Sequence, residues 1–367
     1  MSCGARTGLE LARGGALDAG GEPESGGTGG QTAGGAGGSA SDGASTGGAP
    51  TGGASGGDGG SPQTAPFCPL DFGAAEAVSL WAGSSELFVV AEDNRQLALW
   101  SKPYAGGEWL LLWRQDILAR SAPTLTGFPD GGPLVLYGGE PCGVQFFYGD
   151  RVTCELSGTP TYDLHVVSST EAYAATAQGI LHFDGYTWTA AAPLPDAGVF
   201  QFTKSVWADA NRLLVLTAWG DSALIYAARN GTMALRGELS VDNETFTNVE
   251  ANSESEWLLT EDGELYVRWE GTSQWYLSTF FSGECSDFEE VWLHGPARYV
   301  RNRHSVTLLN DVENLRLVDL PCDSSATIAS AVTSPEGDLY VALLDEALSA
   351  CSGVVITKGH GATVSSF

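Results

Sequence analysis

The chain has 367 residues and a formal net charge of −28 at pH 7, from 17 Lys and Arg against 45 Asp and Glu. Residues 1–66 contribute −4 of this charge, which leaves −24 for the rest of the chain. A surface this acidic repels phosphate backbones and anionic lipid, so we expect neither nucleic-acid binding nor peripheral membrane binding. No apolar stretch of the sequence reaches the length of a membrane-spanning helix.

The first 66 residues differ in composition from the remainder. They hold 23 of the 49 glycines and none of the Trp, Tyr or Phe residues, and 26–60 is a low-complexity run of Gly, Ser, Thr and Ala. Such a segment buries too little apolar surface to offset the entropy lost on ordering. We therefore predict a disordered tether over 1–66 and one folded domain over 67–367.

Cys3 follows a small residue and precedes this glycine-rich run. The arrangement resembles the mature start of bacterial lipoproteins, in which a cysteine after the signal region is acylated and a linker follows. The resemblance implies lipidation at Cys3, and Gly4 at the next position implies the outer membrane or cell surface. It also implies a start codon upstream of Met1, because no signal region is written here. The alternative is an ordinary N-terminus with a free cysteine.

From residue 77 onward, a pair of short apolar strands joined by a turn recurs seven times. Each second strand has one central apolar residue that serves as an anchor: Phe88, Val135, Tyr173, Leu214, Trp257, Tyr299 and Tyr340. The anchors are separated by 47, 38, 41, 43, 42 and 41 residues, and a third and fourth strand follow in the clearest units. Four antiparallel strands per repeat of this length predict an all-β fold, a seven-bladed β-propeller of four-stranded antiparallel blades.

The turn between the third and fourth strands is clearest in "GILHFDGYTWT" (179–189) and "GELYVRWEGTSQW" (263–275). Its acid and glycine are adjacent, at Asp184-Gly185 and Glu270-Gly271, which predicts a tight turn and not a sugar-hydrolase Asp box. The units resemble propeller repeats of exported bacterial proteins, which begin Val-Trp-Ala and end Gly-x-x-Trp. They fit neither the WD40 nor the kelch pattern.

Six cysteines remain after Cys3, an even number that predicts disulfides in an exported chain. Cys142 and Cys154 are the most local pair. On the repeat scheme, Cys285–Cys322 spans the sixth unit and Cys68–Cys351 joins the ends of the ring. In the same scheme, "FCPLDF" (67–72) supplies the outer strand of the seventh blade.

Candidate chemistry is sparse. The five histidines, His165, His182, His294, His304 and His360, are never two or four residues apart, and no cysteine pair has zinc-ligand spacing, so we expect no metal site. No nucleophile elbow or phosphate loop is present, so we expect no cofactor. Asp287, Glu289 and Glu290 are candidates for a glycoside-cleaving carboxylate pair.

One cluster is basic: Arg298, Arg301, Arg303 and His304 concentrate positive charge in an acidic domain. Arg301 and Arg303 are expected on one strand face, because side chains alternate. The cluster is a candidate anion or acidic-sugar site. The alternative is that these arginines pair with acids on neighbouring blades.

The sequence therefore predicts a monomeric, non-catalytic propeller that binds a protein or a polysaccharide at one face, at the cell surface. The main alternative is a propeller enzyme, a hydrolase or lyase acting on polysaccharide. Inward-pointing carboxylates with an arginine would favour the enzyme, and a channel of small and apolar residues would favour the scaffold. A third hypothesis is an assembly partner that pairs a peptide strand, which requires an open blade edge.

Overall fold

The computed structural model describes residues 77–92, 96–116, 123–128, 132–139, 142–149, 151–191, 193–194, 202–219, 222–229, 232–240, 245–281, 285, 287–295, 297–309, 314–345, 354–360 and 363–366. All of them belong to one compact unit, residues 61–367. The predicted tether and Cys3 lie outside the described residues. Where the structure describes the chain, it contains no helix long and apolar enough to cross a membrane.

In the described ranges, 28 strands form seven four-stranded antiparallel sheets, here called blades 1 to 7 in chain order. The innermost strands are β1 (Ala77–Ala82), β5 (Thr124–Gly127), β9 (Thr161–Ser168), β13 (Phe202–Asp209), β17 (Phe246–Ala251), β21 (Phe288–His294) and β25 (Ala326–Thr333). The second strands are β2 (Glu86–Glu92), β6 (Leu134–Tyr137), β10 (Glu171–Thr176), β14 (Arg212–Trp219), β18 (Ser255–Thr260), β22 (Ala297–Asn302) and β26 (Leu339–Asp345).

The third strands are β3 (Gln96–Pro103), β7 (Val144–Tyr148), β11 (Gly179–Phe183), β15 (Ser222–Arg229), β19 (Glu264–Trp269), β23 (Ser305–Leu309) and β27 (Val354–His360). The outermost strands are β4 (Leu110–Asp116), β8 (Arg151–Cys154), β12 (Trp188–Ala190), β16 (Thr232–Ser240), β20 (Tyr276–Phe280), β24 (Asn314–Asp319) and β28 (Thr363–Ser366).

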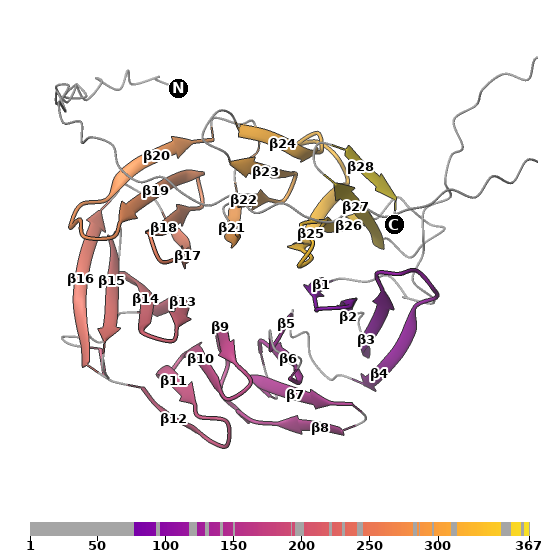
Figure 1. The fold of residues 1–367 in the computed structure, drawn as a ribbon, viewed down its shortest axis with the longest axis horizontal. Helices are drawn as coiled ribbons and strands as arrows, with labels where there is room; N and C mark the ends of the chain where they lie inside the picture. Colours follow the sequence, from indigo (N-terminus) through magenta and orange to yellow (C-terminus); the bar gives the residue numbers. More distant parts are fainter. Residues whose placement is uncertain are drawn as a thin grey trace, which may run out of the picture. The chain divides into compact units, whose positions relative to one another are not determined.

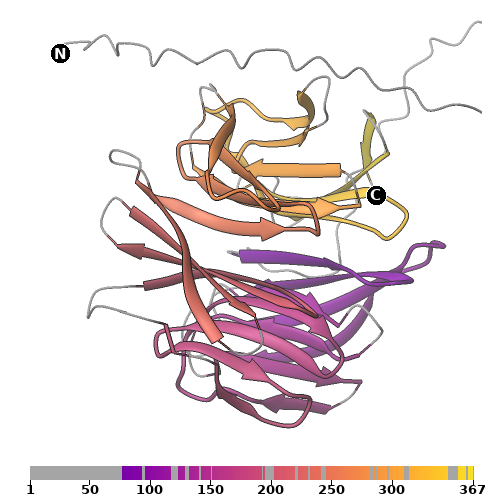
Figure 2. The ribbon, with the colours of Figure 1, turned by 60° about the vertical axis from the view of Figure 1, so that its left-hand side comes forward.

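The blades are arranged in a ring, with β1, β5, β9, β13, β17, β21 and β25 around the centre (Figure 1). The turned view shows neighbouring sheets packed face to face (Figure 2). The predicted all-β propeller of four-stranded antiparallel blades is confirmed. Gly185 and Gly271 have φ of 92° and 82° and lie in turns between third and fourth strands, as predicted.

Apolar residues of the second and third strands fill the seams between neighbouring blades. In the seam between blades 4 and 5, for example, Leu214, Leu216 and Ile225 are fully buried against Val249 and Leu258. Strand residues alternate between the two faces of a sheet, so each central strand supplies side chains to two seams. This explains why the second strand of each repeat carries the most regular apolar signal in the sequence.

The ring closes by packing blade 7 against blade 1. Leu80, Leu87 and Trp100 of blade 1 share one buried cluster with Tyr340 and Ala342 of blade 7. The fourth strand of blade 7 is β28, which pairs with β27. In the described part of the chain, β28 takes the outer place that was predicted for residues 67–72, which themselves lie outside the described residues. No described strand is shared across the closure.

Two of the predicted disulfides are confirmed. Cys142–Cys154 joins residues 12 apart in blade 2, and Cys285–Cys322 joins the segment entering blade 6 to the segment leaving it, 37 residues later. Such cross-links stabilise mainly by restricting the unfolded chain. The proposed Cys68–Cys351 pair lies outside the described residues.

A buried ion-pair network occupies one end of the seam between blades 4 and 5. Glu256 on β18 is 2% exposed and meets three arginines. Arg268 Nε donates to Glu256 Oε2 at 2.8 Å, and Arg236 Nη2 and Arg212 Nη1 lie 3.0 and 3.4 Å from Oε1. Glu270 adds a second acid to Arg212 and Arg236. We call Glu256 and these three arginines the seam network.

Candidate functional site

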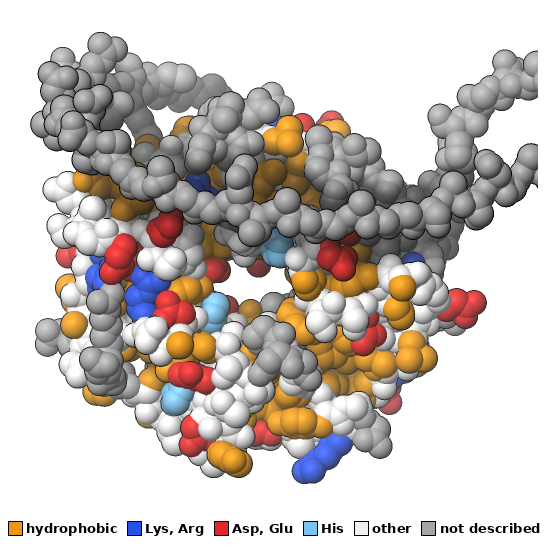
Figure 3. Space-filling view, in the orientation of Figure 1, with side chains coloured by type: hydrophobic (Ala, Val, Ile, Leu, Met, Phe, Trp, Pro, Cys, Tyr) orange, Lys and Arg blue, Asp and Glu red, His pale blue; other side chains and the backbone are white. Residues whose placement is uncertain are grey.

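A cavity of about 820 Å³ lies at the centre of the ring and is lined by the innermost strands of all seven blades. The space-filling view shows the hollow (Figure 3). The innermost strand of each blade has one free edge, whose backbone N–H groups need partners. We call this cavity the channel.

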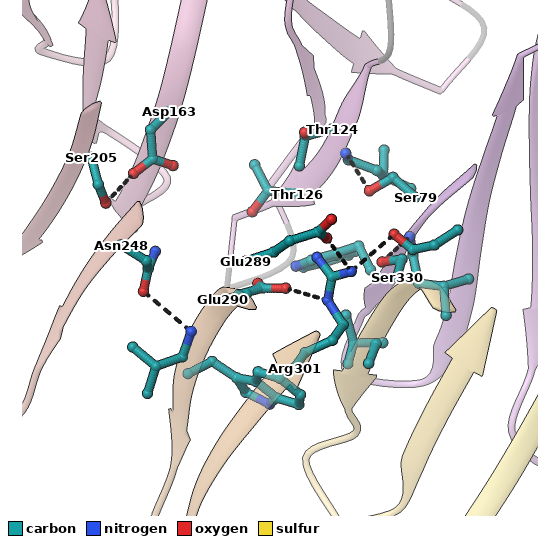
Figure 4. A pocket seen from close by; sticks show the side chains of 18 of the residues that line it. Ser79, Thr124, Thr126, Asp163, Ser205, Asn248, Glu289, Glu290, Arg301 and Ser330 are labelled. Carbon is teal, nitrogen blue, oxygen red and sulfur yellow. Dashed lines mark hydrogen bonds and ion pairs between the residues drawn. The ribbon is translucent and has the colours of Figure 1, made fainter. Parts of the chain in front are cut away.

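One polar residue per blade recurs at the same place on the innermost strands and lines the channel (Figure 4). Each comes directly before an apolar residue: Ser79, Thr124, Asp163, Ser205, Asn248, Glu290 and Ser330. We call these seven residues the polar ring.

Five polar-ring residues accept a hydrogen bond from a backbone N–H of the following blade. The bonds are Leu125 N to Ser79 Oγ (2.9 Å), Val206 N to Asp163 Oδ2 (2.9 Å), Val249 N to Ser205 Oγ (3.3 Å), Val291 N to Asn248 Oδ1 (3.4 Å) and Leu80 N to Ser330 Oγ (3.1 Å). The last of these crosses the closure between blades 7 and 1. The polar ring thus satisfies backbone groups at the free inner edges and ties successive blades together.

Asp163 is the most heavily bonded member of the polar ring. Its Oδ2 accepts from Ser205 Oγ at 2.7 Å as well as from Val206 N, and its Oδ1 accepts from Leu164 N at 2.8 Å and Tyr137 Oη at 3.3 Å. Burial raises the pKa of Asp163, while these hydrogen bonds act in the opposite direction. This carboxylate is committed to holding blades 3 and 4 together.

Glu290, the other acid of the polar ring, is held by Arg301. The guanidinium places Nε 3.2 Å from Glu290 Oε2 and Nη1 2.6 Å from Glu289 Oε2, and it also donates to the carbonyl of Ile328 in blade 7 at 3.2 Å. Figure 4 shows Arg301 between the two glutamates. Burial raises the pKa of Glu290, and Arg301 opposes this rise.

Glu250 lines the channel two residues after Asn248, beyond the polar ring. Burial, with Asp163 and Glu290 adding like charge, raises the pKa of Glu250 to about 8. Burial lowers the pKa of His165 to about 4, and its ring lies 5.7 Å from that of Trp207. At pH 7 the channel wall therefore holds a protonated Glu250 and a neutral His165.

A β-bulge precedes the polar-ring residue in five blades, since the register with the second strand shifts by one residue there. The extra residues all line the channel: Tyr162, Lys204, Thr247, Glu289 and Ala329. Bulges re-aim side chains and recur next to functional sites. Because every innermost strand begins at the same end of the channel, these five residues gather there, and we call this end the mouth.

The predicted basic cluster does not converge on one site. Arg298 lies over the ring of Trp257 at 4.8 Å, and Arg301 is buried in the channel wall. Arg303 lies in the turn after β22, at the mouth, 58% exposed and 3.3 Å from Glu289.

The acids that pair with Arg301 and Arg303 are Asp287, Glu289 and Glu290. They belong to blade 6 itself, and not to neighbouring blades as the sequence had suggested, because β21 and β22 are antiparallel neighbours. His304 follows Arg303 in the turn and donates its backbone N–H to Asn302 Oδ1 at 2.8 Å. The predicted carboxylate pair is thus already bound by arginines.

Sequence reasoning missed the polar ring, the bulges and Glu250. A signal for the polar ring exists: a polar residue stands before an apolar one at the same place in every unit, as in "VSLW", "YDLH" and "KSVW". The bulges and the pKa of Glu250 depend on cross-strand register, which one strand does not reveal. In the described part of the chain, no group of three or more His, Cys, Asp or Glu residues could hold a metal ion.

No protein-family model matches the sequence, and no curated protein matches it either. The solved structures that resemble it include a domain of Doa1 and the protein PorZ. The WD40 β-propeller domain of Doa1 aligns with a TM-score of 0.58 at 12% identity, over 81% of this chain and 98% of that domain. PorZ, an essential bacterial surface component of the type-IX secretion system of Porphyromonas gingivalis, aligns with a TM-score of 0.55 at 13% identity, over 82% of this chain.

The chain spans 39% of the length of the PorZ chain. At these identities the likeness concerns the fold. The chain is a β-propeller. The ligand of this propeller has to be argued from its own side chains.

Proposed function

We propose that this propeller is a non-catalytic binding or scaffolding protein of the bacterial cell envelope, and that it takes its ligand at the mouth of the channel. The polar ring carries the proposal. Two of the channel carboxylates, Asp163 and Glu290, occupy positions that serine, threonine or asparagine fill in the other blades. Asp163 fastens blades 3 and 4 together and Glu290 is paired with Arg301, so inward-pointing acids do not by themselves make an acid pair for catalysis.

The mouth supplies the contacts that remain available. Tyr162 is 52% exposed, Lys204 is exposed, and Arg303 stands beside Glu289. An aromatic ring, cations and a carboxylate around one opening suit a polar ligand of mixed charge, such as a protein segment or a polysaccharide. Five successive blades contribute, so the site depends on the closed ring.

Two features support an exported location. The two disulfides are of the kind that persists in oxidising compartments. Lipidation of Cys3, followed by a tether over 1–66, would hold the domain 67–367 at the cell surface. Mass spectrometry of protein expressed with the signal region that this proposal requires tests it, because an acyl mass is expected on the peptide that contains Cys3.

The experiment uses the full chain with a panel of insoluble polysaccharides and envelope fractions. Depletion of protein from solution and release of sugar are both measured. We expect depletion without release, and its loss in a double variant, Tyr162→Ala with Lys204→Ala. The matched control is Tyr186→Ala, an 87% exposed tyrosine in an outer turn of blade 3. Equal depletion by both variants would place the ligand elsewhere on the molecule.

A second candidate function is a propeller enzyme acting on polysaccharide, and Glu250 is the observation that favours it. Its pKa of about 8 keeps the acid protonated at neutral pH, as a general acid requires, and Asp163 and Arg301 line the same channel. Sugar release that disappears in Glu250→Gln, with depletion retained, would replace the binding proposal with this one.

A further inference from the structure

The outermost strand of blade 5 is an apolar free edge. In β20, Tyr276, Leu277 and Phe280 are 44%, 52% and 53% exposed, and the strand contains no charged residue, proline or glycine. Its sheet ends at this strand, and no other described strand pairs with it. An edge of this kind presents a row of backbone N–H and C=O groups to any strand that approaches.

The other six outer strands of the described blades either carry charge or are short. Charged residues stand in four of these strands: Arg114 and Asp116 in β4, Arg151 in β8, Arg236 and Glu238 in β16, and Arg316 and Asp319 in β24. The two remaining outer strands, β12 and β28, have three and four residues. Charge and shortness are the usual means by which sheets prevent strand addition. Blade 5 has neither.

Both faces of β20 carry apolar side chains. Leu277 pairs with Tyr266, which packs toward blade 4, and Tyr276 pairs with Val267, which packs toward blade 6. The ring of Tyr276 lies 5.5 Å from that of Trp269, itself 49% exposed. An added strand would therefore find apolar contacts for alternate side chains on both of its faces.

We propose that β20 is a docking edge for an extended peptide segment of a partner protein, which adds to blade 5 as a fifth strand. The five residues of β20 offer an edge roughly 17 Å long. A stable dimer buries about 800 Å² of surface on each subunit, which is far more than this edge provides. A short peptide strand requires no more surface than the edge itself. This site is distinct from the channel mouth and goes beyond the function proposed there.

Charge defines the partner further. The chain carries a net charge of −28, and Glu264, the first residue of β19, stands opposite Phe280 of β20. Basic residues flanking an apolar strand would be steered to this edge and held there. The fitting segment is therefore an uncharged β-forming core with lysine or arginine on both sides.

The test uses the full chain and a fluorescent synthetic peptide, Lys-Lys-Thr-Val-Thr-Val-Thr-Val-Lys-Lys, titrated to about 1 mM. We expect saturable binding, with slowed amide hydrogen exchange confined to residues 276–280. Leu277→Lys should weaken binding at least tenfold. Leu235→Lys should leave it unchanged, because Leu235 is also 52% exposed but lies on the edge of blade 4.

Several outcomes would overturn the proposal. The first is an absence of binding, and the second is equal binding by Leu277→Lys and the wild type. The third is equal binding of a peptide with prolines in place of the second and third valines, because such a peptide cannot add as a strand and would bind through its charge alone. If the wild type sediments as a dimer and Leu277→Lys as a monomer, the strand that occupies the β20 edge comes from a second copy of this chain. Loss of the mouth site in the Tyr162 and Lys204 variant leaves this measurement unaffected, so the two proposals fail separately.

Discussion

Two glutamates in neighbouring strands of blade 5 experience opposite environments. Glu256 on β18 is buried in the seam network, among the guanidinium groups of Arg212, Arg236 and Arg268. Glu250 on β17 faces the channel, where Asp163 and Glu290 are its charged neighbours and raise its pKa further. Residue type alone therefore does not decide how a buried acid behaves. The surrounding side chains decide it, several of which come from other blades.

The sharpest way to break this contrast is to remove the charge of Glu256. Glu256→Gln leaves three guanidinium groups in a buried seam with one acid fewer, so we expect a loss of roughly 3–5 kcal/mol in the free energy of unfolding. Urea denaturation measures it. Glu254→Gln, an exposed acid in the preceding turn, is the control and should change stability by less than about 0.5 kcal/mol. A loss under about 1 kcal/mol for Glu256→Gln would mean that the network contributes little.

Glu250→Gln tests the other side of the contrast. The folded protein holds a proton on Glu250 up to pH about 8, whereas the unfolded chain releases it near 4.5. The wild type should therefore lose stability as pH rises from about 5 to 8 and level off above. Glutamine does not titrate, so the free energy of unfolding of the variant should rise relative to that of the wild type by roughly 1–3 kcal/mol between pH 5 and 8. Parallel stability curves from pH 5 to 8 would show that the pKa is not raised.

A smaller effect is expected from the polar ring. Ser79→Ala removes the acceptor for Leu125 N and should cost about 1 kcal/mol, as a buried donor loses its partner. Ser278→Ala, an exposed serine on β20, is the matched control. A native-like stability of Ser79→Ala would indicate that water in the channel replaces the hydroxyl.

The smallest effect belongs to Arg303. It is 58% exposed, and its pairs with Glu289 and Asp287 at 3.3 and 3.8 Å are surface contacts. Arg303→Ala should change stability by less than about 0.5 kcal/mol. If the mouth binds a ligand, the same variant should weaken that binding, and a depletion assay detects the difference.

The sequence predicted those parts of the molecule that recur along the chain. A spacing of about 42 residues between Tyr173, Leu214 and Trp257 predicted the propeller, and the positions of Cys142 and Cys154 predicted a local disulfide. The outer strand of blade 7 was misassigned because β28 is short and weakly patterned.

The candidate site was predicted far less well, because its chemistry arises between blades. Arg301 was selected for its charge, yet its partners follow from the pairing of β21 with β22. Nothing local to Glu250 signals a raised pKa, since burial in the closed ring raises it and the acids that add to the rise lie 40 or more residues away in the chain. The properties of the channel residues depend on side chains that are close in space but distant in sequence, and the spacing of the repeats does not reveal those contacts.

The closure of the ring has one more consequence. Since blades 7 and 1 meet through ordinary seam packing and a Ser330 to Leu80 bond like those of other blades, the ring does not depend on where the chain is cut. A circular permutant, with its ends joined by a linker and new termini in the turn between β11 and β12, should rebuild the same molecule. The point at which the tether joins the domain could then be moved without changing the binding face, so the orientation of the propeller toward its ligand could be chosen.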